Sequence, residues 1–245
     1  MELIDLIKEA KNIVAFTGAG LSTESGIPDF RSSSGLYLSG EFEGYTPEQI
    51  LSNRFFREPK NKSTFFKFYK KRIMSMVDKL PNRAHYALKK MEDVGKLTCV
   101  INQNIDNLLQ KAGLKYILDL HGNISHFRCI SCNQQYNHDQ FMAIEGDVPR
   151  CFCGGVIRPN TVLFDEWLND DSFDNAYWAA KKCDLFLVIG SSCIVRPSCT
   201  LIGEISDTAH LIIINNMKTP YDKRADIVIN DKSCGEVLES VVNQL

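Results

Sequence analysis

The sequence lacks any apolar run long enough to cross a membrane. No uninterrupted apolar stretch approaches the roughly 18 residues that suggest a spanning helix. The opening residues MELIDLIKEAKN alternate apolar and charged side chains where a signal peptide has an apolar core. The chain also lacks a basic excess, since 28 lysines and arginines stand against 30 acidic residues. We therefore expect a cytoplasmic protein that binds neither membranes nor nucleic acid.

The length and composition indicate an ordinary globular protein. The chain has 245 residues, of which 44% are hydrophobic and 24% are charged, and both fractions are typical of soluble globular domains. A chain of this length has room for one large domain, or for one large and one small domain.

Six short apolar runs predict the strands of a parallel sheet, because strands that are covered on both faces are apolar throughout. They span residues 13–18, 97–102, 117–122, 185–190, 211–215 and 226–230. Amphipathic segments, which predict helices, separate these runs at residues 3–11, 84–94, 104–112, 172–182 and 235–244. Strands that alternate with helices indicate an α/β fold with a doubly wound sheet.

Two segments interrupt this alternation and predict a second, smaller domain. Residues 32–80 begin as a loop and become helical, with many Phe and Lys side chains. Their charge run, KNKSTFFKFYKK, is typical of the solvated face of an amphipathic helix. Residues 124–160 hold four clustered cysteines. The large domain is then expected to comprise residues 1–31, 81–123 and 161–245.

Four cysteines have the spacing of a zinc site. Cys129 and Cys132 form one pair, and Cys151 and Cys153 form another after an interval of 18 residues. Each pair can supply two thiolates to one tetrahedral Zn²⁺, and four thiolates leave no open position for catalysis. A redox or disulfide pair is the alternative. The other cysteines are expected to be buried thiols, and they are Cys99, Cys183, Cys193, Cys199 and Cys234.

A glycine turn follows the first apolar run, within TGAGLSTESGIPDFR. Gly18 and Gly20 provide the first two glycines of a dinucleotide-binding turn, but the third position holds Thr23. An acidic residue at the end of a second strand is also missing, as is the Gly-Lys-Ser/Thr of a P-loop. Amides at the start of the next helix favour a bound phosphate, whereas the departures argue against hydride transfer by a dehydrogenase.

Polar side chains follow two other strands at their carboxyl ends, where an open α/β sheet binds its ligands. Gln103, Asn104 and Asp106 follow the run 97–102, and their amide and carboxylate groups can hold ribose hydroxyls and a carboxamide. The alternative is that Asn104 and Asp106 cap the next helix. His121 ends another run. It is a candidate general base if its imidazole is neutral, or else a structural histidine.

These motifs together resemble the sirtuins, the NAD-dependent protein-lysine deacylases. The resemblance rests on GAGLSTESGIPDFR, QNIDNLLQKAG, LHGN, the paired cysteines, IRPNTVLFDE, GSSCIVRP and IINN, in the order in which the family carries them. It implies a Rossmann-like large domain and a small domain made of a helical module, residues 32–80, and a zinc-binding module, residues 124–160. NAD and its substrate would meet in the cleft between the two domains.

The resemblance also implies a set of site residues. The catalytic ones would be His121, as the base, and Asn104. NAD would contact Gly18, Ala19, Gly20, Thr23, Asp29, Phe30, Arg31, Gln103, Asn104, Ile105, Asp106, His121, Gly190, Ser191, Ser192, Asn215, Asn216 and Cys234. An acyl-lysine peptide would lie as an added strand, which binds through its backbone, against Val162, Leu163, Phe164, Glu166 and Val195.

By the same resemblance, the enzyme would consume NAD as a co-substrate. It would transfer the acyl group from lysine to ADP-ribose, with release of nicotinamide and 2′-O-acyl-ADP-ribose. One structural Zn²⁺ per chain and acyl-lysine proteins or peptides as partners complete this expectation. A mono-ADP-ribosyltransferase on the same scaffold and a non-catalytic NAD-binding sensor are the alternatives.

The sequence departs from the sirtuin pattern at the expected peptide groove and in the loop after the glycine turn. Asp165 stands where the family often has glycine, and Arg196 stands where an aromatic residue is common. Residues 37–40, Tyr-Leu-Ser-Gly, lack the Tyr-x-x-Arg pair that holds the extra carboxylate in sirtuins selective for succinyl or malonyl groups. We therefore expect neutral acyl groups, with acetyl first.

Overall fold

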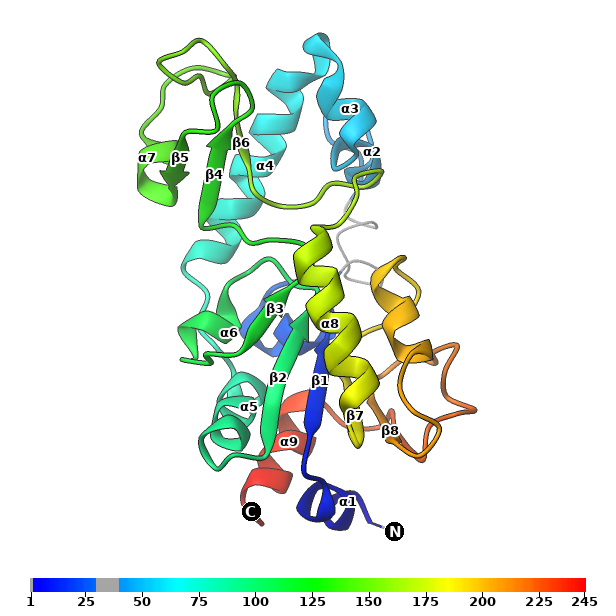
Figure 1. Ribbon diagram of the computed structural model, residues 1–245. Coiled ribbons are helices and arrows are strands. Elements are labelled where there is room, and N and C mark those ends of the chain that lie inside the picture. The colour runs from blue at the N-terminus through cyan, green and yellow to red at the C-terminus, as the bar shows by residue number, and fades with distance from the viewer. Residues whose placement is uncertain (1, 30–39) are drawn as a thin grey trace.

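A six-stranded parallel sheet forms the centre of the larger part of the protein (Figure 1). The computed structural model describes residues 2–29 and 40–245, apart from the side chains of residues 73 and 74. The strand order is β3-β2-β1-β7-β8-β9, and every pair is parallel. The strands are β1 Ile13–Thr17, β2 Leu97–Asn102, β3 Ile117–Asp119, β7 Leu185–Ile189, β8 His210–Ile214 and β9 Ile227–Ile229.

This strand order creates a crevice between β1 and β7. The chain runs outward from β1 through β2 to β3, then returns to β7 on the other side of β1 and runs outward again. The connections after β1 and β7 therefore leave the sheet in opposite directions. Such a reversal opens a crevice at the carboxyl ends of the two strands, which is where open α/β sheets bind ligands.

Helices cover both faces of the sheet. Side chains of β1 alternate, so that Ile13 and Ala15 pack in one core, and Val14 and Phe16 pack in the other. The first core is closed by α1 Leu3–Glu9, α5 Arg83–Asp93 and α9 Cys234–Val242, and the second by α8 Asp170–Lys182 and the 3₁₀ helix η4 Ser198–Gly203. Helix α8 lies in front of the sheet in Figure 1. These two cores confirm the predicted doubly wound α/β sheet.

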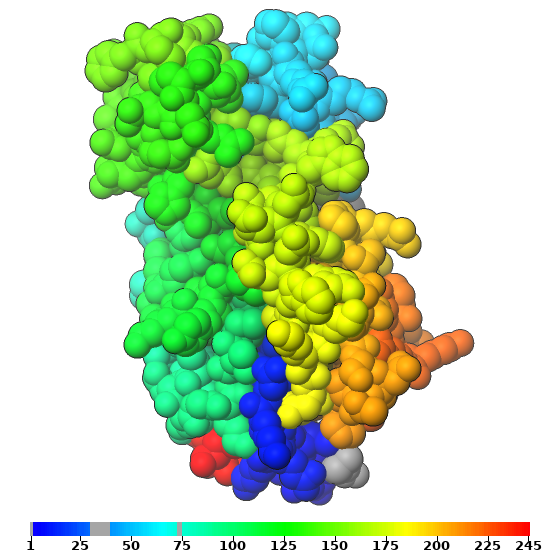
Figure 2. Space-filling view, viewed as in Figure 1, coloured from blue at the N-terminus to red at the C-terminus, as the bar shows by residue number. Residues whose placement is uncertain are grey.

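A second, smaller assembly combines helices with a three-stranded antiparallel sheet. Its elements are α2 Pro47–Ile50, α3 Asn53–Arg57, the 3₁₀ helix η3 Pro59–Asn61, α4 Lys62–Val77, β4 His126–Cys129, β5 Gln135–Asn137, α7 His138–Met142 and β6 Ile157–Pro159. They share one core, in which the rings of Phe127 and Phe141 stack with centroids 3.9 Å apart and Phe66 lies beside Phe141. Figure 2 shows both parts of this assembly, cyan and green, at the upper end of the molecule. The exact domain limits remain a prediction.

The helix predicted at residues 104–112 is mostly a loop. Only α6 Leu108–Lys111 is helical, because Asn107 adopts a left-handed conformation with φ of 63°. The carboxylate of Asp106 accepts a hydrogen bond from the amide of Leu108 at 2.9 Å, so the capping alternative holds for Asp106. It does not hold for Asn104, whose side chain points to the turn after β1.

Across the described residues, none of the helices combines the length and apolarity that a membrane span requires.

Candidate active site

One pocket at the carboxyl ends of the parallel strands collects the site residues that the sequence analysis selected. Phe30 and Arg31 lie outside the described residues. The selected residues that line the pocket are Gly18, Ala19, Gly20, Thr23, Asp29, Gln103, Asn104, Ile105, Asp106, His121, Val162, Leu163, Phe164, Glu166, Gly190, Ser191, Ser192, Val195, Asn215, Asn216 and Cys234. Residues as far apart in sequence as Gly18 and Cys234 therefore share one pocket.

Two glycine turns press backbone against backbone at the mouth of the β1–β7 crevice. The amide of Gly20 donates to the carbonyl of Gly190 at 2.8 Å. A Cβ on Gly20 would lie 2.7 Å from the Gly190 Cα. Gly190 has φ of 61°, and its Cβ would lie 2.3 Å from the amide nitrogen of Leu21. The segment after the first turn is a seven-residue 3₁₀ helix, η1 Ala19–Ser25, and not the α-helix of a dinucleotide fingerprint.

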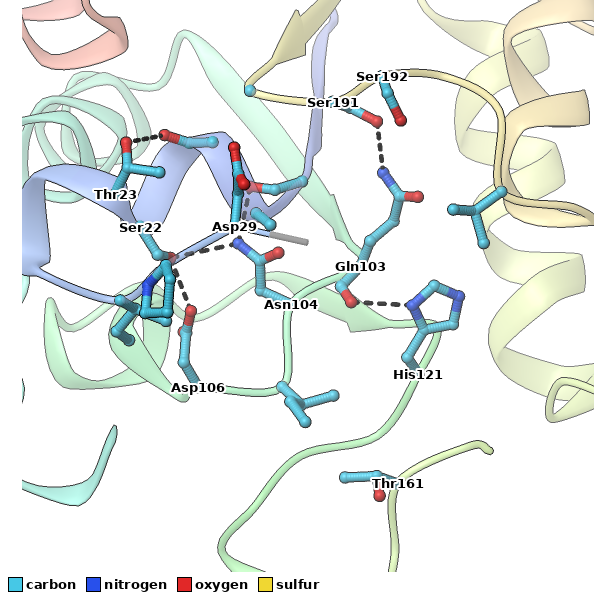
Figure 3. A pocket seen from close by; sticks show the side chains of 18 of the residues that line it. Ser22, Thr23, Asp29, Gln103, Asn104, Asp106, His121, Thr161, Ser191 and Ser192 are labelled. Atoms are coloured by element: carbon cyan, nitrogen blue, oxygen red, sulfur yellow. Dashed lines mark hydrogen bonds between the residues drawn. The ribbon is translucent and has the colours of Figure 1, made fainter. Parts of the chain in front are cut away.

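Asn104, Ser22 and Asp106 form a buried polar cluster at the floor of the pocket (Figure 3). The Asn104 amide donates to the Gly18 carbonyl at 2.9 Å, and the Ser22 hydroxyl donates to the Asp106 carboxylate at 2.6 Å. Burial raises the pKa of Asp106, while the hydrogen bonds from Ser22 and the Leu108 amide oppose that rise. These hydrogen bonds join residues 104–106 to the glycine turn and its following segment. They explain why residues 104–106 form a loop and not the start of a helix.

Gln103 connects the ends of β2 and β7. Its side-chain nitrogen donates to the Ser191 hydroxyl at 2.9 Å, and its side-chain oxygen accepts from the Ser198 hydroxyl at 3.2 Å. Its main-chain carbonyl faces His121. The two hydrogen-bonded ends of the side chain fix the backbone that orients the histidine.

His121 has the tautomer and the charge state of a general base. Its Nδ1 lies 2.8 Å from the Gln103 carbonyl oxygen, and because a carbonyl only accepts, Nδ1 carries the proton. Nε2 therefore keeps a free lone pair. Burial lowers the pKa of His121, and the bond to Gln103 opposes this only in part. The imidazole is consequently neutral at neutral pH, as general-base catalysis requires.

The segment 162–166 forms the opposite wall and is anchored on both sides. The amide of Val162 donates to the His121 carbonyl at 2.9 Å. The amide of Phe164 donates to the Leu51 carbonyl at 2.9 Å. The Glu166 carboxylate pairs with Arg158, with the shorter contact at 2.6 Å. The same carboxylate accepts from the Leu163 amide at 2.9 Å, so it fixes the shape of this wall from within.

Among the pocket residues that the sequence analysis missed are Tyr69 and Arg72 of α4. Tyr69 is 1% exposed, and its hydroxyl lies 3.0 Å from the Thr161 hydroxyl oxygen. Arg72 is 9% exposed. Their spacing is Tyr-x-x-Arg, the pair that residues 37–40 lack. Residues 37–39 lie outside the described residues. The signal was present in FYKKR, residues 68–72, which overlaps the end of the charge run interpreted as a solvated face.

The four paired cysteines converge on a point that fits Zn²⁺. Their sulfur atoms all lie within 4.8 Å of one another, with Cys129–Cys153 at 3.5 Å and Cys132–Cys151 at 3.6 Å. Tetrahedral zinc with bonds of about 2.3 Å places its sulfurs about 3.8 Å apart. The Tyr136 hydroxyl donates to the Cys151 sulfur at 3.0 Å.

All nine cysteines are free thiols. Of the five outside the cluster, four are buried as expected, whereas Cys99 is half-buried.

A protein-family model described as "Sir2 family" matches residues 18–197 of the chain. The chain belongs to the Sir2 family. Among its relatives, the NAD-dependent protein deacetylase of Clostridium tetani is 44% identical over 244 residues, which cover 99% of this chain and 97% of the relative. That of Clostridium acetobutylicum is 42% identical over 98% of this chain and 97% of the relative.

Solved Sir2 structures share the fold over nearly the whole chain. Sir2 with a p53 peptide and NAD⁺ has a TM-score of 0.89 at 34% identity, covering 100% of this chain and 98% of that one. A Sir2 variant with a deacetylated p53 peptide and 3′-O-acetyl-ADP-ribose has a TM-score of 0.90 at 34% identity, covering 98% and 96%. Sir2Tm bound to a propionylated peptide has a TM-score of 0.87 at 34% identity, covering the same shares.

The contact between the two glycine turns predicts a large effect for Gly190→Ala. Residue 190 has a left-handed backbone conformation, and the added Cβ would meet the backbone of Leu21. We therefore expect the free energy of unfolding, measured by urea denaturation, to fall by about 2 kcal/mol or more. Gly203→Ala is the matched control, because a Cβ there meets nothing within 4 Å, and it should stay within about 0.5 kcal/mol of the parent. Equal stability of both variants would contradict the close approach.

Proposed function

We propose that this Sir2-family chain is an NAD-dependent protein-lysine deacylase. The observation that carries the proposal is a neutral His121, with Nε2 free as a base, in the same pocket as the glycine turns and the 162–166 segment. A nucleotide and an acylated peptide can thus both reach one base. NAD is a consumed substrate in this reaction and leaves as nicotinamide and 2′-O-acyl-ADP-ribose.

NAD lies across the carboxyl ends of β1, β2 and β7 in this proposal. Its phosphates lie against the two glycine turns, because glycine lets a backbone approach an anion closely. The amides of Gln103 and Asn104 face the nicotinamide-side ribose, with Asn104 in a catalytic role. Ile105 and Asp106 face the carboxamide. The remaining contacts, to the phosphates and adenosine, fall to Ser191, Ser192, Asn215, Asn216 and Cys234.

The reaction places one proton transfer on His121. The acyl oxygen of the modified lysine displaces nicotinamide from C1′ of the ribose. His121 Nε2 then takes a proton through the ribose hydroxyls, which frees the 2′ oxygen to attack the acyl carbon. Water finally releases the lysine and 2′-O-acyl-ADP-ribose. The pocket must therefore align the acyl oxygen with C1′ and keep water out until the acyl group has arrived.

The peptide enters as a strand between residues 162–166 and 194–197. Phe164 forms a parallel bridge with Ser52, through hydrogen bonds with Leu51 and Asn53, so strand pairing already occurs at this wall, which supports binding of the peptide as an added strand. Solved Sir2 structures carry acetylated and propionylated peptides, which supports the same substrate class for this chain. Asp165 and Arg196 line the pocket on the two sides of the groove and would influence which peptides bind.

The four-cysteine cluster holds a structural Zn²⁺ in this proposal. Cys129, Cys132, Cys151 and Cys153 fill all four tetrahedral positions, so the ion has no place for a substrate. When bound, the ion would cross-link β4 to the loop before β6 through metal–thiolate bonds. A Cβ on Gly155 would lie 2.6 Å from the Cys129 sulfur, so this glycine makes room for the thiolate.

Tyr69 and Arg72 favour a second substrate class, acyl groups that end in a carboxylate. A buried guanidinium in a pocket wall binds a carboxylate in a charge-assisted, bidentate manner, and a tyrosine hydroxyl one helical turn away can add a donor. Both side chains line the same pocket as His121. Succinyl- and malonyl-lysine are then substrates beside acetyl-lysine, in contrast to the neutral preference expected from residues 37–40.

The proposed function is tested by incubating the protein with NAD and an acetyl-lysine peptide and analysing all products by mass spectrometry. We expect deacetylated peptide together with O-acetyl-ADP-ribose. A peptide that stays acetylated while a protein gains ADP-ribose would indicate the transferase, and nicotinamide release at background with every acyl peptide would indicate a sensor.

Replacing the base should separate catalysis from binding. In His121→Ala we expect deacetylation to fall by about 100-fold or more, the scale of general-base catalysis, while NAD binding by calorimetry remains measurable. The wild-type kcat/KM should stay level near neutral pH and fall only as the pH drops through the lowered pKa of His121, below 6.5, because protonation removes the lone pair. A fall centred above pH 6.5 would contradict the role.

The zinc assignment predicts a specific loss in Cys151→Ser. Removal of one thiolate should abolish stoichiometric zinc, measured by elemental analysis, and lower the melting temperature, because structural zinc contributes folding free energy. Cys99→Ser is the control, since Cys99 lies outside the cluster, and it should keep its zinc. Full metal content in the Cys151 variant would refute the four-thiolate site.

The acyl preference is measured as the ratio of kcat/KM for succinyl-lysine to that for acetyl-lysine in the same peptide. Arg72→Met should lower this ratio by about tenfold or more, which is the scale of a lost charge-assisted hydrogen bond. Lys71→Met, which removes a charge from the exposed neighbouring position of α4, should leave the ratio unchanged. No turnover of succinyl- or malonyl-lysine by the wild type would restore the neutral preference.

A further inference from the structure

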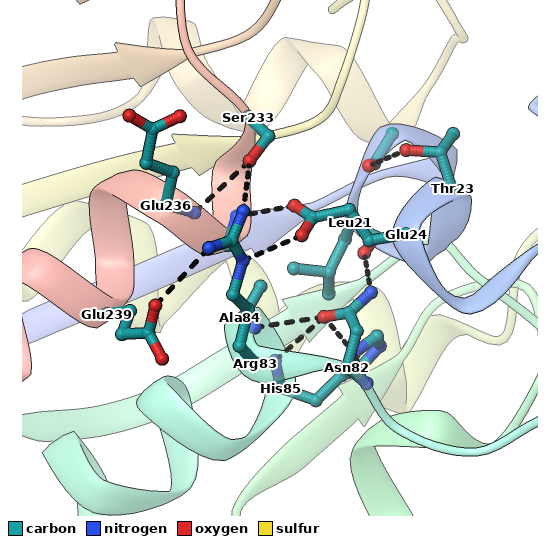
Figure 4. Close-up of polar contacts among 12 residues, drawn as sticks. Leu21, Thr23, Glu24, Asn82, Arg83, Ala84, His85, Ser233, Glu236 and Glu239 are labelled. Atoms are coloured by element: carbon teal, nitrogen blue, oxygen red, sulfur yellow. Dashed lines mark hydrogen bonds and ion pairs between the residues drawn. The ribbon is translucent and has the colours of Figure 1, made fainter.

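Three segments that are far apart in sequence meet around the ion pair of Glu24 and Arg83 (Figure 4). They are η1, which follows β1, and the first turns of α5 and α9. Residues of η1 line the pocket on one side, and Lys232, Ser233 and Cys234 line it where α9 begins. The position of α9 relative to η1 therefore sets part of the width of the pocket.

Glu24 joins η1 to α9. One of its carboxylate oxygens accepts from the Gly235 amide at 2.8 Å, and the other accepts from Arg83 Nε at 2.8 Å. Burial alone would raise the pKa of Glu24, but hydrogen bonds from Arg83, the Gly235 amide and Ser233 lower it below its ordinary value. The carboxylate is thus charged at neutral pH, and it lies at the positive end of the α9 dipole.

The other two nitrogens of the Arg83 guanidinium donate hydrogen bonds to α9 and its N-cap. Nη2 donates to the Ser233 hydroxyl at 3.1 Å, and Nη1 donates to the Glu239 carboxylate at 3.3 Å. The Ser233 hydroxyl also accepts from the Glu236 amide at 3.2 Å as the N-cap of the helix. One planar side chain on α5 therefore holds Glu24 of η1 and two residues of α9, a geometry that a lysine cannot reproduce.

Gly235 makes room for this arrangement. A Cβ at this position would lie 2.5 Å from Arg83 Cγ and 2.7 Å from the Glu24 carboxylate. Its φ is not in the left-handed region, so backbone freedom does not account for the glycine. The absence of a side chain lets Glu24 and Arg83 lie directly on the first turn of α9.

Apolar packing alone does not fix the first turn of α9. Helices α5 and α9 pack through Ala84, Leu88, Leu238 and Val241 in the core beneath the sheet. Such packing is non-directional and allows small shifts along the helix axis. The directional bonds of Glu24 and Arg83 select one position, which places Ser233 and Cys234 in the pocket wall.

We propose that Glu24 and Arg83 are positioning residues for NAD, which hold the Lys232–Cys234 wall at the distance from η1 that the ADP-ribose part requires. This inference rests on the proposed function, since it assigns that part of NAD to this wall. Neither residue touches the acyl-peptide wall at residues 162–166. Their loss should therefore weaken nucleotide binding and leave peptide binding alone, because a wall that must first be ordered lowers affinity.

The test compares three variants by calorimetry with ADP-ribose and by steady-state kinetics with NAD. Arg83→Met should raise the Kd for ADP-ribose and the KM for NAD about fivefold, the scale seen when residues outside a ligand site affect its binding. The KM for the acetyl peptide should not follow. Gly235→Ala keeps both charges but displaces both side chains, and it should have the same phenotype. Arg83→Lys should be intermediate.

Lys90→Met is the matched control. Lys90 lies on the same helix and donates to the Val242 carbonyl at the far end of α9, at 2.8 Å, so its loss loosens the same helix pair away from the pocket. It should lower the melting temperature without changing the Kd for ADP-ribose. The inference is overturned if Arg83→Met and Gly235→Ala bind ADP-ribose within twofold of the wild type. It is also overturned if Lys90→Met weakens binding equally, or if the wild type binds no ADP-ribose.

The calorimetric arm separates this inference from the proposed function. A wild-type protein that binds ADP-ribose but releases no nicotinamide would refute the deacylase, whereas the Kd values of the variants would still decide the role of Glu24 and Arg83. If Arg83→Met fails to fold, Gly235→Ala and Arg83→Lys carry the same comparison.

Discussion

The contact between the turns after β1 and β7 is the constraint on which the rest of the site depends. It brings Gly20 and Gly190 close enough for a backbone hydrogen bond of 2.8 Å, and neither position has room for a side chain. The turn after β1 leads into η1, and the turn after β7 leads into Ser191 and Ser192. The groups of these two turns that are assigned to the nucleotide are therefore placed by this single approach of two backbones.

The base, His121, is oriented by a residue that bonds to the turn after β7. Gln103 donates to Ser191 after β7 and accepts from Ser198, and its carbonyl fixes the tautomer of His121. The carbonyl of His121 in turn accepts from Val162, where the peptide wall begins. A continuous path of hydrogen bonds thus connects the nucleotide side of the pocket with the acyl side, and the histidine lies on it. This arrangement suits a reaction in which both substrates must meet before one proton moves.

Much of the fold and the site could be predicted because the responsible signals are local. The six strands of the sheet are apolar runs, and the glycines, His121 and the paired cysteines lie in short motifs. The loop at residues 104–107 could not be predicted, because its polar side chains bond to the turn after β1 rather than to the next helix. Arg72 was missed for a similar reason. It follows a run of exposed charges, and only the packing of α4 shows that its side chain is turned into the pocket.

The claim at the centre of this account is that the pocket consumes NAD to remove an acyl group. The most direct measurement is the molar ratio of O-acetyl-ADP-ribose, nicotinamide and deacetylated peptide formed in a single turnover of the wild-type protein. The account predicts that the three products appear in equal amounts and that no reduced nicotinamide forms. Nicotinamide without O-acetyl-ADP-ribose, or absorbance from reduced cofactor, would contradict it.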